Sequence, residues 1–161
     1  MRKSISEDLQ LFFTGGFPAV LQTKCYNNLA ILGIGGNIGN VKRRFKKLLL
    51  FLKSNPKIRP IATAPILKNP PFGYMEQADF YNSIIAVDTT FSPQELLHYA
   101  LYIEKRFKRE RTFKNAPRTL DVDIIFFEDK IVNKKDLFIP HPFWSERESV
   151  IIPLKFLLEF R

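Results

Sequence analysis

The stretch APRTLDVDIIFFED, residues 116–129, decides the fold. Its β-branched and aromatic residues predict a β-strand over Leu120–Phe127, interrupted by two aspartates, Asp121 and Asp123. Residues i and i+2 of a strand point to the same face, so the two carboxylates should lie side by side, roughly 6.5–7 Å apart at the backbone. The side chains expected on the other face or in the core are Val122, Ile124 and Phe126.

Two carboxylates on one strand face repel each other, and removing them from water costs several kcal/mol each unless a positive group lies between them. Mg²⁺ would satisfy them, because it takes oxygen ligands and completes its shell with water and phosphate oxygens. Two such ions, about 3.5–4 Å apart, would clamp a phosphate chain. A D-x-D pattern alone leaves two alternatives open, which are salt bridges to nearby arginines and exposure at a strand end.

A basic run, EKRFKRERTFKNAPR, occupies Glu104–Arg118 directly before this strand, with seven basic and two acidic residues in 15 positions. Arg109, Arg111, Lys114 and Arg118 fall on the end of a predicted helix and on the loop that leads to the strand. Guanidinium groups match phosphate oxygens, so the run favours a triphosphate with Mg²⁺. A nucleic-acid patch and a solvated loop are the alternatives.

The composition fits one domain of 161 residues with 45% hydrophobic residues. The formal net charge of +9 indicates an anionic partner. A single cysteine, Cys25, argues against a disulfide framework and a cysteine-based zinc site, and predicts a reducing, cytoplasmic location. We expect no membrane span, because no apolar run is long enough, and no export signal, because Glu7 and Asp8 interrupt the start.

The remaining patterns predict an alternating order of elements. Residues 1–28 show no clear period and are treated as an extension of uncertain order, and 29–161 as one domain. The predicted elements are a strand at Leu29–Leu32, a helix from Val41, a strand at Ile58–Ala64, a loop at 64–74, a strand at Phe80–Asp88, a helix from the capping box at Ser92–Glu95, a brief return at Ile131–Val132, a loop at Asp136–Pro142 and a helix around 151–160. This order predicts an α+β, ferredoxin-like β-α-β-β-α-β fold with extra C-terminal elements.

Common nucleotide-binding motifs are missing from the glycine-rich stretch GIGGNIG, residues 33–39. It is not G-x-G-x-x-G, and no G-K-[ST] follows, which excludes a Rossmann fingerprint and a P-loop. Gly35 and its neighbours still end a strand and open a helix, where backbone N–H groups can face a ligand, although a plain tight turn explains them equally well. The aromatic motif of RNA-binding ferredoxin-like domains is also missing.

Several motifs together resemble the 6-hydroxymethyl-7,8-dihydropterin pyrophosphokinase family. The motif APRTLDVDI resembles the family signature GPRTLDLDI, and it is accompanied in the right order by GIGGN, EQADFYN, SPQELL, IEKRFKRER and FIPHP. The resemblance covers about residues 29–158. It implies transfer of pyrophosphate from ATP to the hydroxymethyl group of a dihydropterin, with release of AMP, two Mg²⁺ ions and a step of folate biosynthesis.

The resemblance also implies roles for individual residues. Asp121 and Asp123 would hold both metal ions and, with Arg109 and Arg118, form the catalytic set. Residues expected on the ATP side are Glu104, Arg111, Lys114, Arg118, Ile124, His141 and Arg147. Residues expected around the pterin are Gly35, Pro70, Phe72, Phe80 and Asn82. Loops 69–76 and 106–117 are expected to close over ATP. We expect a monomer that binds neither nucleic acid nor membrane, with the next folate-pathway enzyme as a candidate partner.

Three positions depart from the family pattern. Asn115 stands where a loop-sealing tryptophan is expected, Leu101 where a glutamine is expected, and Ser149 where a second stacking aromatic is expected, with Phe143 or Trp144 as substitutes. A catalytically impaired relative therefore remains an alternative, as does an RNA-binding ferredoxin-like module that uses the basic loop.

Overall fold

The computed structural model describes residues 1–159. Within that range, three α-helices and one short 3-10 helix accompany ten strands. The strands are β1 (Arg2–Ser4), β2 (Gln10–Phe12), β3 (Ala19–Val20), β4 (Asn28–Gly36), β5 (Ile58–Thr63), β6 (Ile66–Asn69), β7 (Phe80–Thr89), β8 (Asp121–Phe127), β9 (Val132–Lys134) and β10 (Leu137–Ile139). The helices are α1 (Val41–Lys53), α2 (Pro93–Arg106), η1 (Trp144–Glu146) and α3 (Glu148–Glu159). The fold is therefore α+β.

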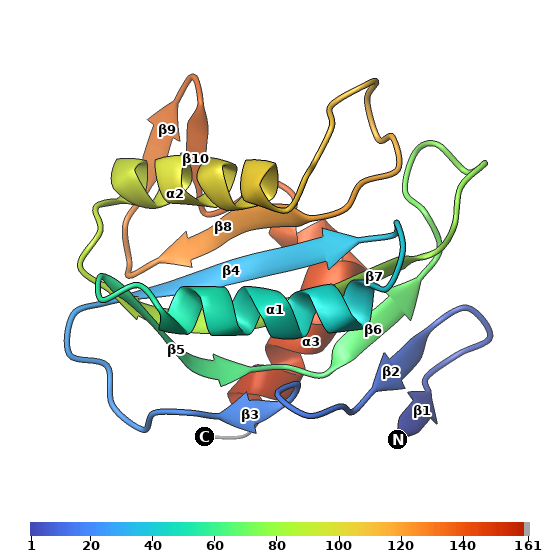
Figure 1. Ribbon diagram of the computed structural model, residues 1–161, viewed down its shortest axis with the longest axis horizontal. Coiled ribbons are helices and arrows are strands. Elements are labelled where there is room, and N and C mark those ends of the chain that lie inside the picture. The colour runs from blue at the N-terminus through green and yellow to red at the C-terminus, as the bar shows by residue number, and fades with distance from the viewer. Residues whose placement is uncertain (160–161) are drawn as a thin grey trace.

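Eight strands form one antiparallel sheet, in which β7 and β4 are central (Figure 1). Strand β4 pairs with β7 on one side and with β8 on the other. Strand β7 pairs with β6 along its first residues and with β5 along its last ones. The aspartate strand is thus an edge strand beside the glycine-rich strand. Strands β9 and β10 form a separate hairpin.

The helices divide between the two faces of the sheet, with α1 and α2 on one face and α3 across the other (Figure 1). The larger core cluster joins the sheet to the first two helices, through residues such as Phe45 and Leu96. The smaller cluster includes Ile31, Ile125 and Leu154 and lies under α3. Helix α2 begins at the predicted capping box, in which Ser92 Oγ accepts from Glu95 N and Glu95 Oε1 accepts from Ser92 N.

A β-bulge breaks the alternation of β8. Leu32 pairs with Ile124 and Ile31 with Phe126, so Ile125 is the extra residue. Val122 and Ile124 point into the larger cluster as predicted, but Phe126 joins Ile125 in the smaller one. Phe126 therefore packs against the core, which was one of the two predicted places, but it lies on the face of Ile125, because the inserted residue shifts the alternation of side chains along the strand.

Residues 1–28 contribute three short strands to the sheet. Strand β2 pairs with β6, and β3 pairs with β5. The side chain of Phe17 is completely buried in the larger core cluster, where it packs against Phe45 with ring centroids 5.9 Å apart. This segment is therefore continuous with the sheet and the core.

Several predicted boundaries need correction. The strand predicted at Leu29–Leu32 extends through the glycines to Gly36, because β7 and β8 supply ladder partners on both sides. The predicted loops 64–74 and Asp136–Pro142 contain β6 and β10. The last helix begins at Glu148 rather than near residue 151, and residue 160 of the predicted range lies outside the described residues.

Candidate active site

The two aspartates lie on one face of β8, opposite two glycines of β4. Asp121 pairs with Gly35, and Asp123 pairs with Gly33. Because glycine has no side chain, this pairing leaves room for neighbouring side chains: Asn82 Oδ1 takes the space beside Gly35, and Ile125 Cδ1 would lie 3.0 Å from a Cβ atom at Gly33. Gly36 is also tightly placed, since a Cβ atom there would lie 2.5 Å from the Thr119 carbonyl oxygen. The glycine run therefore lets β4 approach Thr119 closely at Gly36 and leaves room for the Asn82 and Ile125 side chains at Gly35 and Gly33.

The two aspartates have different surroundings. Asp121 is held by two arginines, with its Oδ1 in contact with Arg109 Nη1 and its Oδ2 2.9 Å from Arg118 Nη1. Asp123 is exposed and takes part in no ion pair within residues 1–159. Burial lowers the pKa of Arg109, whereas the Glu104 carboxylate opposes this shift. Burial also lowers the pKa of Arg118, and the nearby Arg109 cation adds to the effect. The structure therefore shows the salt-bridged alternative for one aspartate only.

Glu104 anchors the arginines to the sheet. Its buried carboxylate accepts a hydrogen bond of 2.8 Å from Val122 N and one of 2.7 Å from Arg111 Nη2. Arg109 Nη1 lies 3.4 Å from the same carboxylate. Glu104 thus joins the end of α2 to the first residues of β8. Its oxygens are occupied by protein donors, and its role toward a nucleotide stays a prediction.

A cavity of about 440 Å³ adjoins the aspartates. It brings together most of the residues predicted around the pterin and the phosphates, although they come from five separate segments of the sequence. The predicted residues that line it are Gly35, Pro70, Phe72, Phe80, Asn82, Arg118, Asp121, Asp123, His141 and Arg147. Asn115 and Ser149, two of the residues that depart from the family pattern, also line it.

Five other predicted residues lie outside the cavity lining. Arg109 and Glu104 lie behind Asp121, as described above. The side chain of Ile124 is buried in the larger core cluster on the opposite face, so only its backbone remains near the site. Arg111 and Lys114 are exposed on the loop after α2. Their roles toward a nucleotide stay predictions.

Aromatic rings and cations meet at the cavity. Phe80 is almost completely buried, and the Arg118 guanidinium lies 4.8 Å from its ring centroid. Phe72 is 68% exposed, and its ring centroid lies 5.3 Å from the Arg147 guanidinium carbon. Phe72 is therefore the ring that remains accessible to a flat ligand.

His141 enters the cavity from the loop after β10. Its backbone N–H donates to Ile125 O, and its Nδ1 accepts from Phe143 N at 3.2 Å. Burial lowers the pKa of His141, although the Asp123 carboxylate opposes the shift. When Nδ1 accepts this hydrogen bond in the neutral ring, Nε2 is the nitrogen that carries the proton.

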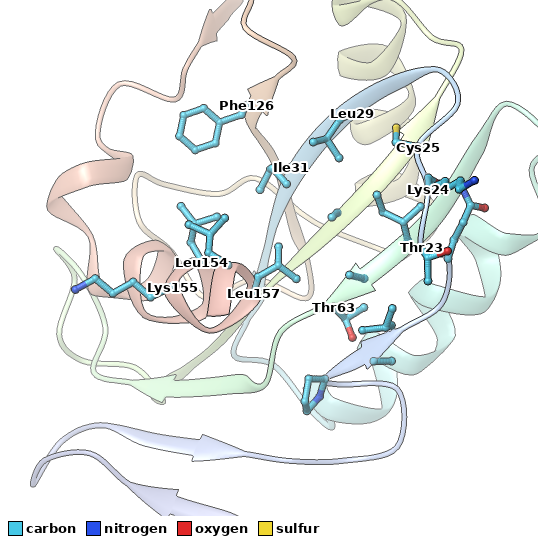
Figure 2. A pocket seen from close by; sticks show the side chains of 18 of the residues that line it. Thr23, Lys24, Cys25, Leu29, Ile31, Thr63, Phe126, Leu154, Lys155 and Leu157 are labelled. Atoms are coloured by element: carbon cyan, nitrogen blue, oxygen red, sulfur yellow. The ribbon is translucent and has the colours of Figure 1, made fainter. Parts of the chain in front are cut away.

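Of the two proposed substitutes for the missing aromatic, Trp144 lies elsewhere. It packs against Phe126 with ring centroids 5.0 Å apart and lines a second, larger hollow of about 1170 Å³. Figure 2 shows this hollow, in which Leu29, Ile31 and Leu154 surround apolar space beside α3. Among residues 1–159, no carboxylate lines it, so it lacks the hard oxygen side chains that would hold a metal ion. Phe143, by contrast, lies 5.5 Å from the Arg147 guanidinium carbon.

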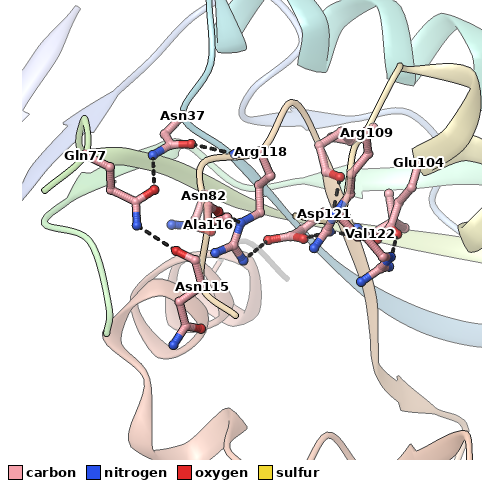
Figure 3. A network of polar contacts seen from close by, with 12 residues as sticks. Asn37, Gln77, Asn82, Glu104, Arg109, Asn115, Ala116, Arg118, Asp121 and Val122 are labelled. Atoms are coloured by element: carbon pink, nitrogen blue, oxygen red, sulfur yellow. Dashed lines mark hydrogen bonds and ion pairs between the residues drawn. The ribbon is translucent and has the colours of Figure 1, made fainter. Parts of the chain in front are cut away.

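An amide network joins the loops around the cavity (Figure 3). Gln77 Nε2 donates to Tyr74 O in one loop and to Asn115 O in the other, at 2.7 and 2.8 Å. Asn37 Nδ2 donates to Gln77 Oε1, and Asn37 Oδ1 accepts from Arg118 N. The sequence analysis considered only the backbone N–H groups of the turn at Gly35, Gly36 and Asn37, so the bonds made by the Asn37 side chain were not predicted.

The aspartate pair fits Mg²⁺ in the chemistry of its donors. Both are hard oxygen donors on one face, and no cation of residues 1–159 has to be displaced from Asp123. In the described part of the chain, no group of three or more metal-ligating side chains gathers. Further ligands would therefore come from phosphate oxygens and water, which is usual for this ion.

Among residues 1–159, no helix is long and apolar enough to cross a membrane.

Paired carboxylates, arginines beside them and a cavity with aromatic and amide groups are typical of a phosphate-transferring enzyme with a flat second substrate. Comparison with known proteins gives the family. The model of the family described as "7,8-dihydro-6-hydroxymethylpterin-pyrophosphokinase (HPPK)" matches residues 31–159, and the chain belongs to this family.

Relatives in other organisms agree with this assignment. The Helicobacter pylori protein named "2-amino-4-hydroxy-6-hydroxymethyldihydropteridine pyrophosphokinase" is 44% identical over 141 residues, which cover 86% of each chain. A Campylobacter jejuni protein of the same name is 41% identical over 139 residues, covering 86% of this chain and 88% of the relative. The Dictyostelium discoideum "Folic acid synthesis protein FOL1" is 37% identical over 134 residues, covering 80% of this chain and 19% of that longer protein.

Proposed function

We propose that this protein transfers pyrophosphate from ATP to the hydroxymethyl group of 6-hydroxymethyl-7,8-dihydropterin, a step of folate biosynthesis. The observation that carries the proposal is family membership over residues 31–159. The cavity supports it, since it joins a carboxylate pair and an arginine to an aromatic and amide-lined space. The enzyme is an ATP-dependent pyrophosphokinase.

In the proposed reaction, the pterin hydroxyl attacks the β-phosphorus of ATP in line, and AMP leaves. Asp121 and Asp123 would hold Mg²⁺, which would neutralise charge on the phosphates. Arg118 and Arg109 would bind phosphate oxygens, which requires them to exchange the Asp121 carboxylate for phosphate. The buried Arg109 Nε has no hydrogen-bond partner within residues 1–159, which is consistent with a missing ligand. One of the two aspartates is the candidate acceptor of the hydroxyl proton.

The pterin side is proposed to be the part of the cavity between β4, β6 and β7. Phe72 offers an accessible ring face for stacking, and Asn82 offers an amide for a polar ring edge. The two loops tied by Gln77 are proposed to close over ATP and exclude water. Equal hydrogen-exchange protection of these loops with and without an ATP analogue would contradict closure.

We also infer that the core has the ferredoxin-like arrangement. The order β5-β7-β4-β8, with every pairing antiparallel, supports this inference, since the first and third strands of the repeat are then central. The boundary between an extension at 1–28 and a domain at 29–161 stays a prediction, as do a monomeric state, a cytoplasmic location and the next pathway enzyme as a partner.

A direct assay tests the proposed function. Protein, ATP, Mg²⁺ and 6-hydroxymethyl-7,8-dihydropterin are mixed, and AMP is quantified by chromatography. AMP that forms only when the pterin is present is the expected result. ADP as the product, or no pterin-dependent product, would contradict it. The second result would favour the impaired relative, to which the departures at Asn115 and Ser149 point, whereas no observation favours the RNA-binding alternative.

A further inference from the structure

The side chain of Asn69 contacts the proposed pterin-reading residue, Asn82. Asn69 is the last residue of β6, and its backbone partner in β7 is Phe80. Asn82 is two residues further along β7, so the two asparagines are diagonal neighbours on one face of the sheet. Asn82 Nδ2 donates to Asn69 Oδ1 at 2.6 Å. Both residues line the 440 Å³ cavity.

A proline carbonyl fixes which way both amides point. Asn69 Nδ2 donates to Pro70 O at 3.0 Å. A carbonyl oxygen can only accept, so Asn69 must turn its NH₂ group toward Pro70 and its oxygen toward Asn82. That oxygen in turn can only accept, so the NH₂ group of Asn82 must face it. The orientation of Asn82 therefore follows from donor and acceptor chemistry alone.

The oxygen of Asn82 is left for a ligand. Oδ1 accepts no hydrogen bond from residues 1–159, and the side chain is half-buried in the cavity wall. This oxygen lies next to Gly35, where an added Cβ atom would collide with it. Strand β4 thus leaves room for the oxygen, which is an available acceptor at the cavity, while one N–H of the same amide is bonded to Asn69.

We propose that Asn69 is a specificity-determining positioning residue that turns the Asn82 amide so that its oxygen, an acceptor, meets the ligand. The matching ligand is a flat heterocycle with N–H donors on the edge that faces β7, such as the ring N–H and amino group of a pterin. The proposal rests on the proposed function, because it assumes that the pterin occupies this part of the cavity. A ring with only acceptors on that edge is disfavoured, because two acceptors would face each other.

The hydrogen bonds from Asn82 to Asn69 and from Asn69 to Pro70 form a relay. Equilibrium binding of the pterin to the full chain tests this relay. The affinity of 6-hydroxymethyl-7,8-dihydropterin is measured by calorimetry with Mg²⁺ and a non-hydrolysable ATP analogue. Asn69→Leu should weaken binding about tenfold, the size of one oriented hydrogen bond. Asn69→Asp should stay within about threefold of the parent, since a carboxylate still accepts from Asn82. Lys68→Gln, on the same strand, is the matched control and should not change the affinity.

A double-mutant cycle separates positioning from a general structural effect. If Asn69 acts through Asn82, Asn69→Leu should have no further effect on affinity in an Asn82→Ala background. An additive loss would overturn the relay, as would unchanged affinity in the single Asn69→Leu variant. AMP formation, measured in parallel, reports on the proposed function separately. Pterin-dependent AMP with unchanged affinity in the variant overturns the relay alone, whereas a parent protein that binds no pterin overturns both.

Discussion

The Arg118 guanidinium donates a hydrogen bond to Asp121, with 2.9 Å between Nη1 and Oδ2. Asp123, two residues further along the same strand face, has no such partner within residues 1–159. The two carboxylates that are expected to hold the metal ions therefore lie in different electrostatic environments. In the ligand-free protein, one carboxylate also stabilises the fold, and the other is kept on the surface without a structural reason.

Replacement of each aspartate by alanine should abolish AMP formation but affect stability differently. Asp121→Ala leaves two half-buried arginines without this carboxylate, so its free energy of unfolding should fall by about 1–3 kcal/mol. Asp123→Ala should stay within about 0.5 kcal/mol of the parent, as expected for an exposed site. Urea denaturation measures the difference, and Asp129→Ala, in the exposed turn after β8, serves as the control. Turnover retained in both variants would remove the metal assignment.

The close approach of β4 and the segment before β8 should make Gly36 sensitive to a single methyl group. An added Cβ atom would lie 2.5 Å from Thr119 O, a backbone atom that cannot rotate away. Gly36→Ala should therefore lower the free energy of unfolding by about 1–3 kcal/mol. Gly15→Ala is the control, because the nearest atom to its Cβ would be Lys46 Nζ at 3.8 Å. Equal thermal midpoints for the two variants would argue against the close approach.

Asp88 should make stability depend on pH. Burial alone would raise the pKa of this carboxyl, but hydrogen bonds from Tyr26 N, Asn27 N and Gln22 Nε2 outweigh it and lower the pKa below 3.8. A depressed pKa in the folded state stabilises the protein above the unfolded value, and this contribution is lost as the pH falls through the folded value. When the pH is lowered from about 5 to about 2, the free energy of unfolding of Asp88→Asn should therefore fall less than that of the parent. Urea denaturation at each pH measures both. Parallel curves would contradict this.

Substitution of Phe17 tests how the first 28 residues contribute to stability and to turnover. Its ring is completely buried against Phe45, so Phe17→Ala should lower the free energy of unfolding by about 3–5 kcal/mol. Val20→Ala, at a side chain that is 60% exposed, should change it by less than about 0.5 kcal/mol. AMP formation per folded molecule should remain unchanged in both, because neither residue touches the 440 Å³ cavity. A loss of turnover without a loss of stability would show that the segment takes part in catalysis.

The local patterns of the sequence predicted the main elements because local physics determines them. The capping box at Ser92 and Glu95, and the helical period from Val41, need no tertiary information. The bulge at Ile125 does, since it appears only when β8 is aligned with β4. Strand β6 was missed for a similar reason: one of its two ladder partners, β2, comes from the first residues of the chain, far away in the sequence.

The site was predictable in composition but not in its pairings. The signature placed the aspartates and Arg118, and the structure gathers most of the other named residues around one cavity. No pattern indicates that Arg109 lies between two carboxylates, or that Glu104 binds the backbone of Val122. Such contacts depend on how the end of α2 meets β8, and sequence spacing does not determine that geometry.

The shared amide of Gln77 has a consequence for inhibitor design. It bonds to Tyr74 O and Asn115 O, and the rings of Tyr74 and Phe113 meet edge to face at 5.2 Å, so the two loops form one connected rim. A compound that displaces either loop must strain both. Resistance can therefore arise at positions that the compound never touches, and screening should include variants in both loops.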